Sequence, residues 1–150
     1  MLSKKVKYAL KAVIYMARHY DGRLMIVSDI SNAEYIPYKF LEKILAQLKQ
    51  NGVLTSKIGR NGGYQLSRPP EQISIGEIIR IIEGRIAPLP CVSTVAYEKC
   101  FDCEDEKKCE IRRTMQFVRD AMVKILDGTS LKDAISMNAD VARQLMYAMA

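Results

Sequence analysis

The sequence has no apolar run of the roughly 18–20 residues that a membrane-spanning helix needs. Its N-terminus begins with basic residues, but Lys7, Lys11 and Arg18 interrupt the apolar positions and no small-residue cleavage site follows. We found neither internal repeats nor low-complexity segments. These absences predict a folded protein that stays in the cytoplasm and does not contact a membrane.

Histidine occurs once, at position 19, which restricts the chemistry that the chain can perform. The sequence contains no nucleophile paired with a histidine base, no phosphate-binding loop and no metal-hydrolase spacing. His19 falls at the end of a predicted helix, where we expect a surface residue and not a ligand. The sequence therefore predicts no enzyme and no catalytic residues.

Acidic residues are scarce in the first half of the chain. Residues 1–70 contain twelve Lys and Arg against four Asp and Glu, whereas residues 71–150 contain eleven against thirteen. With 49% hydrophobic residues, the 150-residue chain can form the core of one domain with an oligomerisation arm. The basic half is expected to face a polyanion, although a well-solvated basic surface would have the same composition.

The basic half has the pattern of a winged helix-turn-helix. Apolar residues recur at helical spacing over 3–20 and 37–48, and a short helix capped by Ser28 is predicted over 28–32. Pro37 suits the first turn of the third helix, whose N-terminal part would enter the major groove of DNA. These elements predict a helix-turn-helix.

A basic β-hairpin is predicted directly after these helices. Strands over 53–58 and 64–66 enclose the glycine-rich turn 59–63. Glycines in this turn let the backbone approach the sugar-phosphate chain, while Lys57 and Arg60 can reach phosphates or a minor groove. The sequence thus predicts a fold that is mainly α with a small β-hairpin wing, namely a winged helix-turn-helix plus a long dimerisation helix.

Predicted exposure selects the candidate DNA contacts. Phe40, Leu41, Ile44 and Leu45 are expected in the core, which leaves the polar side chains between them facing outward. Glu42 repels phosphate, so it either accepts from a cytosine amino group or forms a salt bridge within the helix. The candidate DNA-binding residues are Ser28, Tyr38, Lys39, Glu42, Lys43, Lys57, Arg60, Asn61 and Gly62.

The second half is predicted to hold two longer helices around a loop. Ser74 and Glu77 have the spacing of a capping box, and the helix that they begin ends near Gly84. Ser130 is predicted to cap a last short helix, and 139–150 has a helical pattern. The predicted organisation is a DNA-binding domain over 1–84, a cysteine-containing loop over 85–110, and a dimerisation helix with a C-terminal tail over 111–150.

The helix predicted from residue 111 carries a heptad stripe that must be buried somewhere. It can pack inside its own monomer or against a second copy, and a winged helix that reads a palindrome needs two copies. We expect the homodimer. The stripe consists of Ile111, Met115, Val118, Met122 and Ile125.

All four cysteines, Cys91, Cys100, Cys103 and Cys109, lie in the loop. Without an export signal, metal or redox chemistry is a better interpretation than structural disulfides. Thiolates are soft ligands that suit an iron–sulfur cluster, zinc or copper(I), and nearby acidic residues such as Glu104, Asp105 and Glu106 offer oxygen ligands. Four reduced thiols without a metal, or a disulfide, remain the alternatives.

Over residues 1–135 the chain resembles the Rrf2 family of bacterial transcription regulators. The residues that carry this resemblance are Lys7-Tyr8-Ala9-Leu10, Tyr38-Lys39-Phe40-Leu41-Glu42, Leu45, Leu48, Asn51-Gly52, Gly59, Gly62-Gly63-Tyr64, Leu66 and the cysteine loop before a long helix. The resemblance implies a homodimer that binds promoter DNA and usually represses transcription in response to the state of a cluster.

The resemblance also implies how a cluster, a [2Fe–2S] cluster in the first instance, would be held. Iron–sulfur members have three loop cysteines, the last two separated by five residues as Cys103 and Cys109 are, and here either Cys91 or Cys100 supplies the first. The chain departs from members whose fourth ligand is a histidine three residues after the last cysteine, because it has Arg112 there. It also departs from those with an acidic ligand in the first helix, because it has Tyr8. Three arrangements would account for these departures. All four cysteines hold the cluster, an unusual residue supplies the fourth ligand, or no cluster is bound.

The main prediction is a homodimeric transcription regulator, a repressor, that binds a palindromic operator in double-stranded DNA with an affinity set by the cysteine site. One alternative is a cluster-free regulator that responds to a thiol change or a partner protein. Another, from a different class, is an iron–sulfur electron-transfer or carrier protein with the winged helix as a scaffold. That alternative predicts no salt-dependent, sequence-selective DNA binding.

Overall fold

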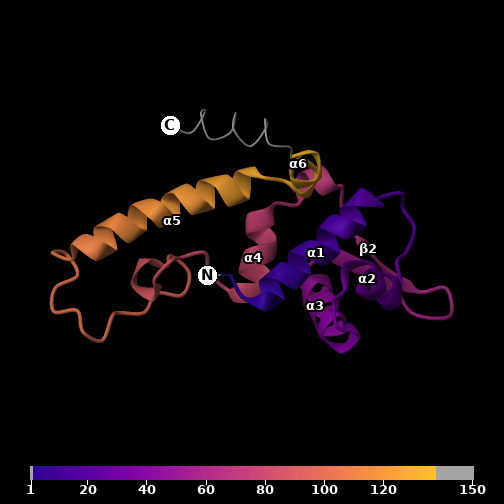
Figure 1. Cartoon of the computed structure of the whole chain (residues 1–150), viewed down its shortest axis with the longest axis horizontal. Helices are drawn as coiled ribbons and strands as arrows, with labels where there is room; N and C mark the ends of the chain where they lie inside the picture. The colour runs from indigo at the N-terminus through magenta and orange to yellow at the C-terminus, as the bar shows by residue number, and fades with distance from the viewer. Residues whose placement is uncertain (1, 138–150) are drawn as a thin grey trace.

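The computed structural model describes residues 2–137, which form helices and one small β-hairpin (Figure 1). The first four α-helices and the hairpin form a compact unit, and α5 extends away from it along the segment that precedes it (Figure 1). The predicted mainly helical fold with a hairpin wing is confirmed. In chain order the elements are α1 Lys4–Arg18, α2 Val27–Glu34, α3 Tyr38–Gln50, β1 Leu54–Lys57, β2 Gly63–Leu66, η1 Pro70–Gln72, α4 Ile75–Glu83, η2 Pro90–Val92, α5 Glu110–Gly128 and α6 Leu131–Ser136.

The core lies where α1 packs against α2, α3, α4 and α6. Ser3 begins α1 by accepting a hydrogen bond from the backbone N–H of Val6 at 3.3 Å, which satisfies one free amide of the first turn. Buried apolar side chains then recur along one face of α1, as the helical spacing predicts. They pack against buried side chains such as Leu48 of α3 and Ile78 of α4.

The hairpin is attached to the helix-turn-helix by backbone hydrogen bonds. β1 and β2 pair antiparallel, from Leu54 opposite Leu66 to Lys57 opposite Gly63. Met25, just before α2, exchanges two backbone hydrogen bonds with Tyr64, each 2.8 Å long. The wing therefore has a fixed position relative to α2, because a third short segment continues its sheet.

Two sequence predictions about the DNA-binding part are wrong. Ser28 does not cap α2, because the helix begins at Val27 with Ile26 in the N-cap position and no side-chain cap. Phe40 is not in the core, because its side chain is 41% exposed and packs edge-to-face on Tyr8 with ring centroids 5.7 Å apart. Leu41, Ile44 and Leu45 are buried as predicted.

The capping box predicted at the start of α4 is half formed. Ser74 accepts from the backbone N–H of Glu77 at 3.1 Å, as expected. The Glu77 carboxylate, however, accepts from the Arg68 guanidinium at 2.5 Å, because a charged donor competes with a backbone amide. A complete capping box occurs at the start of α6, between Ser130 and Asp133.

The long helix α5 is joined to the compact unit at its C-terminal end. The backbone N–H of Ile75 donates to the carbonyl of Thr129, and that of Leu131 donates to Ile73, both at 2.9 Å. Arg80 of α4 forms two hydrogen bonds of 2.7 Å with the carboxylate of Asp127. The predicted helical tail over 139–150 lies outside the described residues.

The pair between Arg80 and Asp127 predicts an acid-dependent part of stability. The Arg80 guanidinium lowers the pKa of the Asp127 carboxyl, so the pair stabilises the fold above the carboxyl's unfolded pKa and is lost as pH falls through its lower folded pKa. Replacing Asp127 with Asn should lower the free energy of unfolding at pH 6 by up to about 1 kcal/mol, since the pair is partly exposed.

Urea denaturation at pH 6 and pH 3 measures this effect. The difference between wild type and Asp127→Asn should shrink at pH 3, and the double variant with Arg80→Gln should lose no more than either single variant. A difference that is constant with pH would contradict an ionic contribution.

Candidate nucleic-acid interface and cysteine site

The turn between α2 and α3 is held by hydrogen bonds and an unusual backbone conformation. Tyr35 has a left-handed backbone conformation, with φ of 53°, which is uncommon for a residue other than glycine. Its side chain is 89% exposed. Ser31 donates through its hydroxyl to the carbonyl of Ile36 at 2.6 Å and accepts at its own carbonyl from the Ile36 N–H at 3.0 Å. Because Ile36 is also buried, the angle between the two helices is determined by several contacts.

The first turns of α3 present the predicted polar side chains to solvent. Tyr38, Lys39 and Lys43 are exposed. Glu42 lies 3.5 Å from the Lys39 ammonium, which agrees with the salt bridge that the sequence allowed. Because both partners are largely exposed, this ion pair is weak and either group can exchange it for a base or phosphate.

The wing presents a second group of predicted contacts. Lys57, Arg60 and Asn61 are exposed at the end of the hairpin. The N–H of Gly62 donates to the carbonyl of Gly59 at 3.0 Å and closes the turn. Any side chain at Gly62 would collide with the Lys57 carbonyl, so this glycine is required by close packing of the backbone. Ser28 is half-buried in the first turn of α2.

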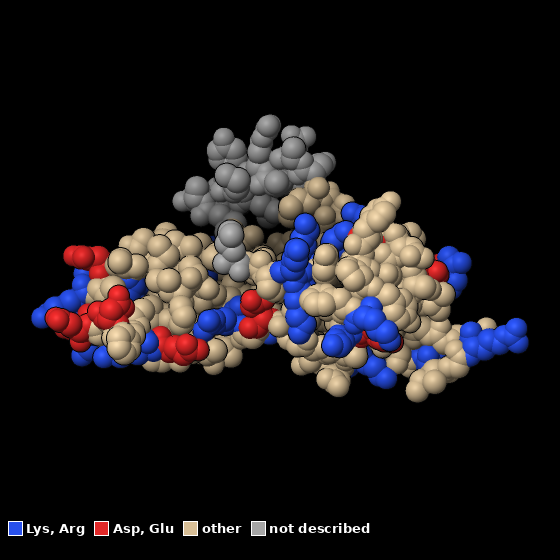
Figure 2. Space-filling model, turned by 60° about the horizontal axis from the view of Figure 1, so that its bottom comes forward, with Lys and Arg blue, Asp and Glu red and all other residues tan. Residues whose placement is uncertain are grey.

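Positive charge dominates this part of the surface. No Asp or Glu occurs over residues 51–70, which contain Lys57, Arg60 and Arg68. Figure 2 shows basic side chains over the right half of the molecule, where Figure 1 places the helix-turn-helix, and at the tip of the projection on the right, with few acidic ones among them. The acidic side chains gather at the opposite end of that view, where Figure 1 places the loop before α5. Such a surface attracts a polyanion.

The head of the cysteine loop is attached to α5 by two arginines that we did not select from the sequence as site residues. Arg112 donates to the carbonyl of Cys91 at 3.3 Å, and Arg119 donates to the carbonyl of Val92 at 2.6 Å. Cys91 and Val92 are both buried. The signal in the sequence was the interval of seven residues between the arginines, which puts both on one face of a helix.

All four cysteines line one cavity of about 620 Å³ between this loop and the start of α5. Cys109 is the N-cap of α5, where its sulfur accepts from the backbone N–H of Arg112 at 3.4 Å. Four soft thiol donors around one cavity have the chemistry that an iron–sulfur cluster requires. Within residues 2–137 no three His, Cys, Asp or Glu side chains are grouped closely enough to hold a metal ion, so ligation by three or more would require the loop to tighten.

The thiols influence one another in two pairs. Hydrogen bonding to Cys91, together with desolvation, raises the pKa of Cys100 to about 11. Burial and the neighbouring Cys109 raise the pKa of Cys103. Both thiols are therefore protonated near neutral pH in this state, and a metal that binds them as thiolates must displace protons.

Of the three acidic residues considered as oxygen ligands, Glu106 has a distinct position. Its carboxylate accepts a hydrogen bond from the Tyr97 hydroxyl and lies 4.0 Å from the Arg112 guanidinium. Glu104 and Asp105 also line the cavity, and Asp105 pairs with Lys108 at 3.7 Å. Glu106 and Arg112 thus connect the middle of the loop to its head and to α5.

The heptad stripe predicted on α5 is only partly covered by the chain itself. Met115 and Met122 are half-buried, and Met122 packs against the core of its own chain. Ile111, Val118 and Ile125 are exposed, and Phe117 beside them is 78% exposed. No residue of α5, which lies wholly within the described part of the chain, is buried. This outer face of α5 leaves apolar surface in water, which is characteristic of an interface.

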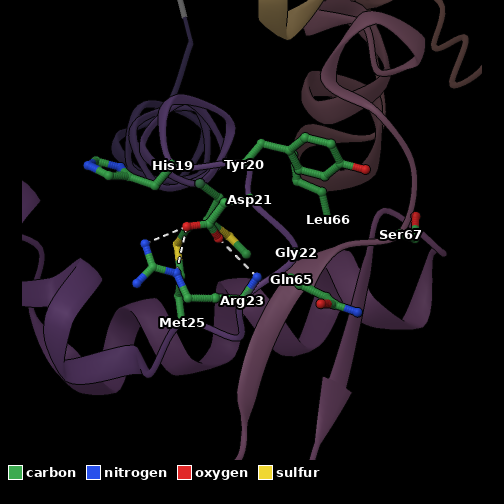
Figure 3. A pocket seen from close by; sticks show the side chains of 10 residues that line it. His19, Tyr20, Asp21, Gly22, Arg23, Met25, Gln65, Leu66 and Ser67 are labelled. Carbon is green, nitrogen blue, oxygen red and sulfur yellow. Dashed lines mark hydrogen bonds and ion pairs between the residues drawn. The ribbon is translucent and has the colours of Figure 1, made fainter.

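A separate cavity of about 300 Å³ lies between the end of α1 and β2 (Figure 3). Asp21 binds Arg23 there, accepting from its backbone N–H at 3.0 Å and from its side-chain Nε at 2.6 Å. The ring of His19 points away from this pair in Figure 3, and its Nδ1 lies 2.9 Å from the carbonyl of Tyr15. His19 is thus an exposed residue at the end of α1, as the sequence predicts, and does not form an acid–base pair with Asp21.

Comparison with known proteins agrees with this arrangement. Residues 2–137 match the family described as Rrf2, iron-dependent transcriptional regulator. The chain is 38% identical, over 97% of its length and 99% of the relative's, to an rrf2-like HTH-type transcriptional regulator of Rhodobacter capsulatus.

Solved structures show the same fold. CymR, the global cysteine regulator of B. subtilis, superposes with a TM-score of 0.74 at 30% identity, covering 91% of this chain and 96% of that one. T. potens IscR superposes with a TM-score of 0.70 at 23% identity, covering 91% and 86%. These relatives indicate a transcription regulator and not an enzyme. No helix among the described residues is long and apolar enough to cross a membrane.

Proposed function

Because this chain belongs to the Rrf2 family of iron-dependent transcriptional regulators, we propose that it is a homodimeric repressor whose promoter affinity responds to an iron–sulfur cluster in the cysteine loop. Residues 1–84 bind the operator, 85–110 form the sensor loop, and the helix α5 within the third segment, 111–150, carries the dimer contacts. The observation that carries this proposal is the cavity lined by all four cysteines at the N-terminus of α5.

DNA is bound by the start of α3 and by the wing. Tyr38, Lys39, Glu42 and Lys43 enter the major groove, where Glu42 exchanges its partner Lys39 for a cytosine amino group. Ser28 in the first turn of α2 contacts the sugar-phosphate chain. In the wing, Lys57, Arg60 and Asn61 contact phosphates or the minor groove, and Gly62 lets the backbone approach.

The second copy packs on the outer face of α5. Its exposed apolar side chains include Ile111, Phe117 and Ile125. A helix of 19 residues with such a face is stabilised by burying it, and a twofold axis between two copies pairs the same surface with itself. The dimer then presents two recognition helices to the two halves of a palindrome.

The cluster is proposed to be [2Fe–2S], and when bound it makes the protein sensitive to iron supply and oxidants. Its ligands come from Cys91, Cys100, Cys103 and Cys109, and we propose Cys100 for the position that a histidine or first-helix carboxylate would otherwise fill. Cys100 lines the same cavity as the other three and interacts with Cys91. Arg112 orients Cys91 and Cys109 through the hydrogen bonds described above.

A continuous set of contacts can carry the state of the loop to the recognition helix. The Cys109 sulfur caps α5, so a change in its bonding alters the first turn of that helix. At the other end, Asp127 of α5 binds Arg80 of α4. The side chain of Gln47 in α3 donates a hydrogen bond of 2.7 Å to the carbonyl of Ile81 in α4. Cluster binding is proposed to shift α5 and thereby the spacing of the two α3 helices.

Anaerobic purification tests this proposal directly. Wild-type protein should be brown and contain iron and sulfide in equal amounts, as a [2Fe–2S] cluster requires. The Cys103→Ser/Cys109→Ser variant should be colourless, and wild-type affinity for operator DNA should differ between cluster-bound and cluster-free protein by about five- to 150-fold. The double variant should bind DNA equally under both conditions.

Thr94→Ala provides the matched control, because Thr94 is exposed in the same loop and does not line the cavity. It should keep the colour and the difference in affinity. Colourless wild-type protein that still binds operator DNA would contradict the cluster and would favour a regulator that responds to a thiol change or a partner protein. Brown protein without salt-dependent, sequence-selective DNA binding would instead indicate an electron carrier.

A further inference from the structure

One side chain of the wing is apolar and almost completely in water. Ile58 is 99% exposed, which is more than any other large hydrophobic side chain over residues 2–92. It follows directly after β1, at the end of the hairpin farthest from the core. An isoleucine at such a position contributes no burial to the fold of the monomer, so its apolar surface is free to contact another molecule.

The backbone around Ile58 is held in one conformation. Gly62 donates to Gly59 across the turn at 3.0 Å, and Lys57 pairs with Gly63 at its base. Tyr64 ties the same hairpin to Met25 beside α2. The tip projects from the unit that contains α3, as Figure 1 shows. These hydrogen bonds restrict its backbone, so it can meet whatever α3 binds with less loss of conformational freedom than an unpaired loop.

The charges around Ile58 select the chemistry of its partner. Lys57 precedes it and Arg60 follows it two residues later, both exposed, and no acidic residue occurs over 51–70. An apolar group between two cations fits a narrow groove with a phosphate chain on each side and stacked bases at its floor. That is the minor groove of double-stranded DNA.

We propose that Ile58 acts as an apolar wedge that enters the minor groove between two base pairs and bends the operator. This proposal rests on the proposed DNA-binding function. Lys57 and Arg60 hold the phosphates on the two sides, while the isoleucine side chain separates one base step and replaces part of its stacking with contacts to itself. Such wedges bend DNA by about 20–90° toward the major groove. Flexible pyrimidine–purine steps should therefore be preferred under the wing, at a position that no polar side chain reads.

The test uses the full-length protein and a 40-base-pair duplex selected from random sequence by the wild type. The end-to-end distance of the duplex, labelled with a dye at each end, reports the bend by energy transfer. Ile58→Ala should reduce the bend by more than half and weaken binding roughly fivefold to fiftyfold, the range that corresponds to losing about 1–2.3 kcal/mol. Ile58→Lys should also reduce the bend, but should restore affinity at low salt and steepen its salt dependence, because it adds a phosphate contact.

Thr55→Ala is the matched control, since Thr55 is exposed on the same hairpin but lies nearer its base. It should leave both bend and affinity unchanged. All three variants should unfold at the wild-type temperature, because neither position is buried.

The possible outcomes distinguish a failure of the wedge from a failure of the proposed DNA binding. If the wild type selects no duplex at low salt, the DNA-binding function itself fails. If the wild type binds and Ile58→Ala bends DNA as much as the wild type does, the wedge is overturned while DNA binding stands. Loss of binding to phosphatidylserine vesicles in Ile58→Ala, with an unchanged DNA bend, would assign the tip to a lipid surface instead.

Discussion

Replacing Leu131 with alanine is expected to lower the free energy of unfolding by about 2–5 kcal/mol, the cost of a cavity at a buried leucine. Leu131 is 0% exposed and is the buried residue of α6. Its backbone N–H donates to Ile73 at 2.9 Å, beside the bridge between Ser74 and Ser130. The cavity would therefore form where the C-terminal helices join the compact unit, and it should loosen α5 from α4 as well as destabilise the core.

Urea denaturation followed by circular dichroism measures the loss. Both variants are compared at one protein concentration, because the proposed dimerisation would make apparent stability depend on concentration. The neighbouring variant Lys132→Ala is the control. It removes an exposed ion pair with Glu71, 2.6 Å long, and should change the free energy of unfolding far less than Leu131→Ala does. Equal losses in the two variants would show that α6 does not hold the C-terminal part to the core.

Replacing Gly63 with alanine is expected to cost about 3 kcal/mol, through overpacking and backbone strain. A Cβ atom at Gly63 would lie 2.6 Å from the carbonyl oxygen of Met25, with φ at 155°. Met25 has little freedom to move away, because both of its backbone hydrogen bonds go to Tyr64. The substitution should therefore detach the wing from the segment before α2, and weaken operator binding as well as stability.

Gly128→Ala is the matched control, since a Cβ atom at Gly128, the last residue of α5, meets nothing within 4 Å. It should be neutral or should stabilise the protein by up to about 1 kcal/mol, because alanine has less conformational entropy to lose on folding. Thermal or urea unfolding of both variants measures the two changes in stability. A Gly63→Ala variant as stable as Gly128→Ala would mean that the contact between Met25 and the wing relaxes freely.

Features that depend on neighbours in the chain were predictable. The apolar spacing of α3, with Leu41, Ile44 and Leu45 on one face, follows from the helical period, so the residues left in solvent could be chosen from the sequence. The glycine-rich hairpin after α3 was recognisable for the same reason, because turns are encoded locally. The DNA-contacting residues remain predictions.

The contacts of side chains that have two possible partners could not be predicted from the sequence. Glu77 had the correct spacing for a capping box, but Arg68, nine residues earlier, takes its carboxylate. Phe40 had the spacing of a core residue, but Tyr8 of α1 meets its ring at the surface. In each case the competing partner comes from another element, and only packing brings it within reach.

The division of the heptad stripe on α5 shows the same limit on a larger scale. Its period predicts a helix with apolar side chains on one side, but does not say which of them meet the chain's own α4. The structure turns Met122 inward and leaves Ile111 and Ile125 in solvent.

The sequence by itself determined the helices, the hairpin, the basic first half and the confinement of all four cysteines to one loop, because each depends on residue order and composition alone. Tertiary structure alone decided that Cys91 is buried and that all four thiols line one cavity at the start of α5. It also decided that Arg112 and Arg119 hold the head of the loop. The physical reason is that burial and hydrogen bonding between distant segments depend on how the helices pack, which spacing along the chain does not specify.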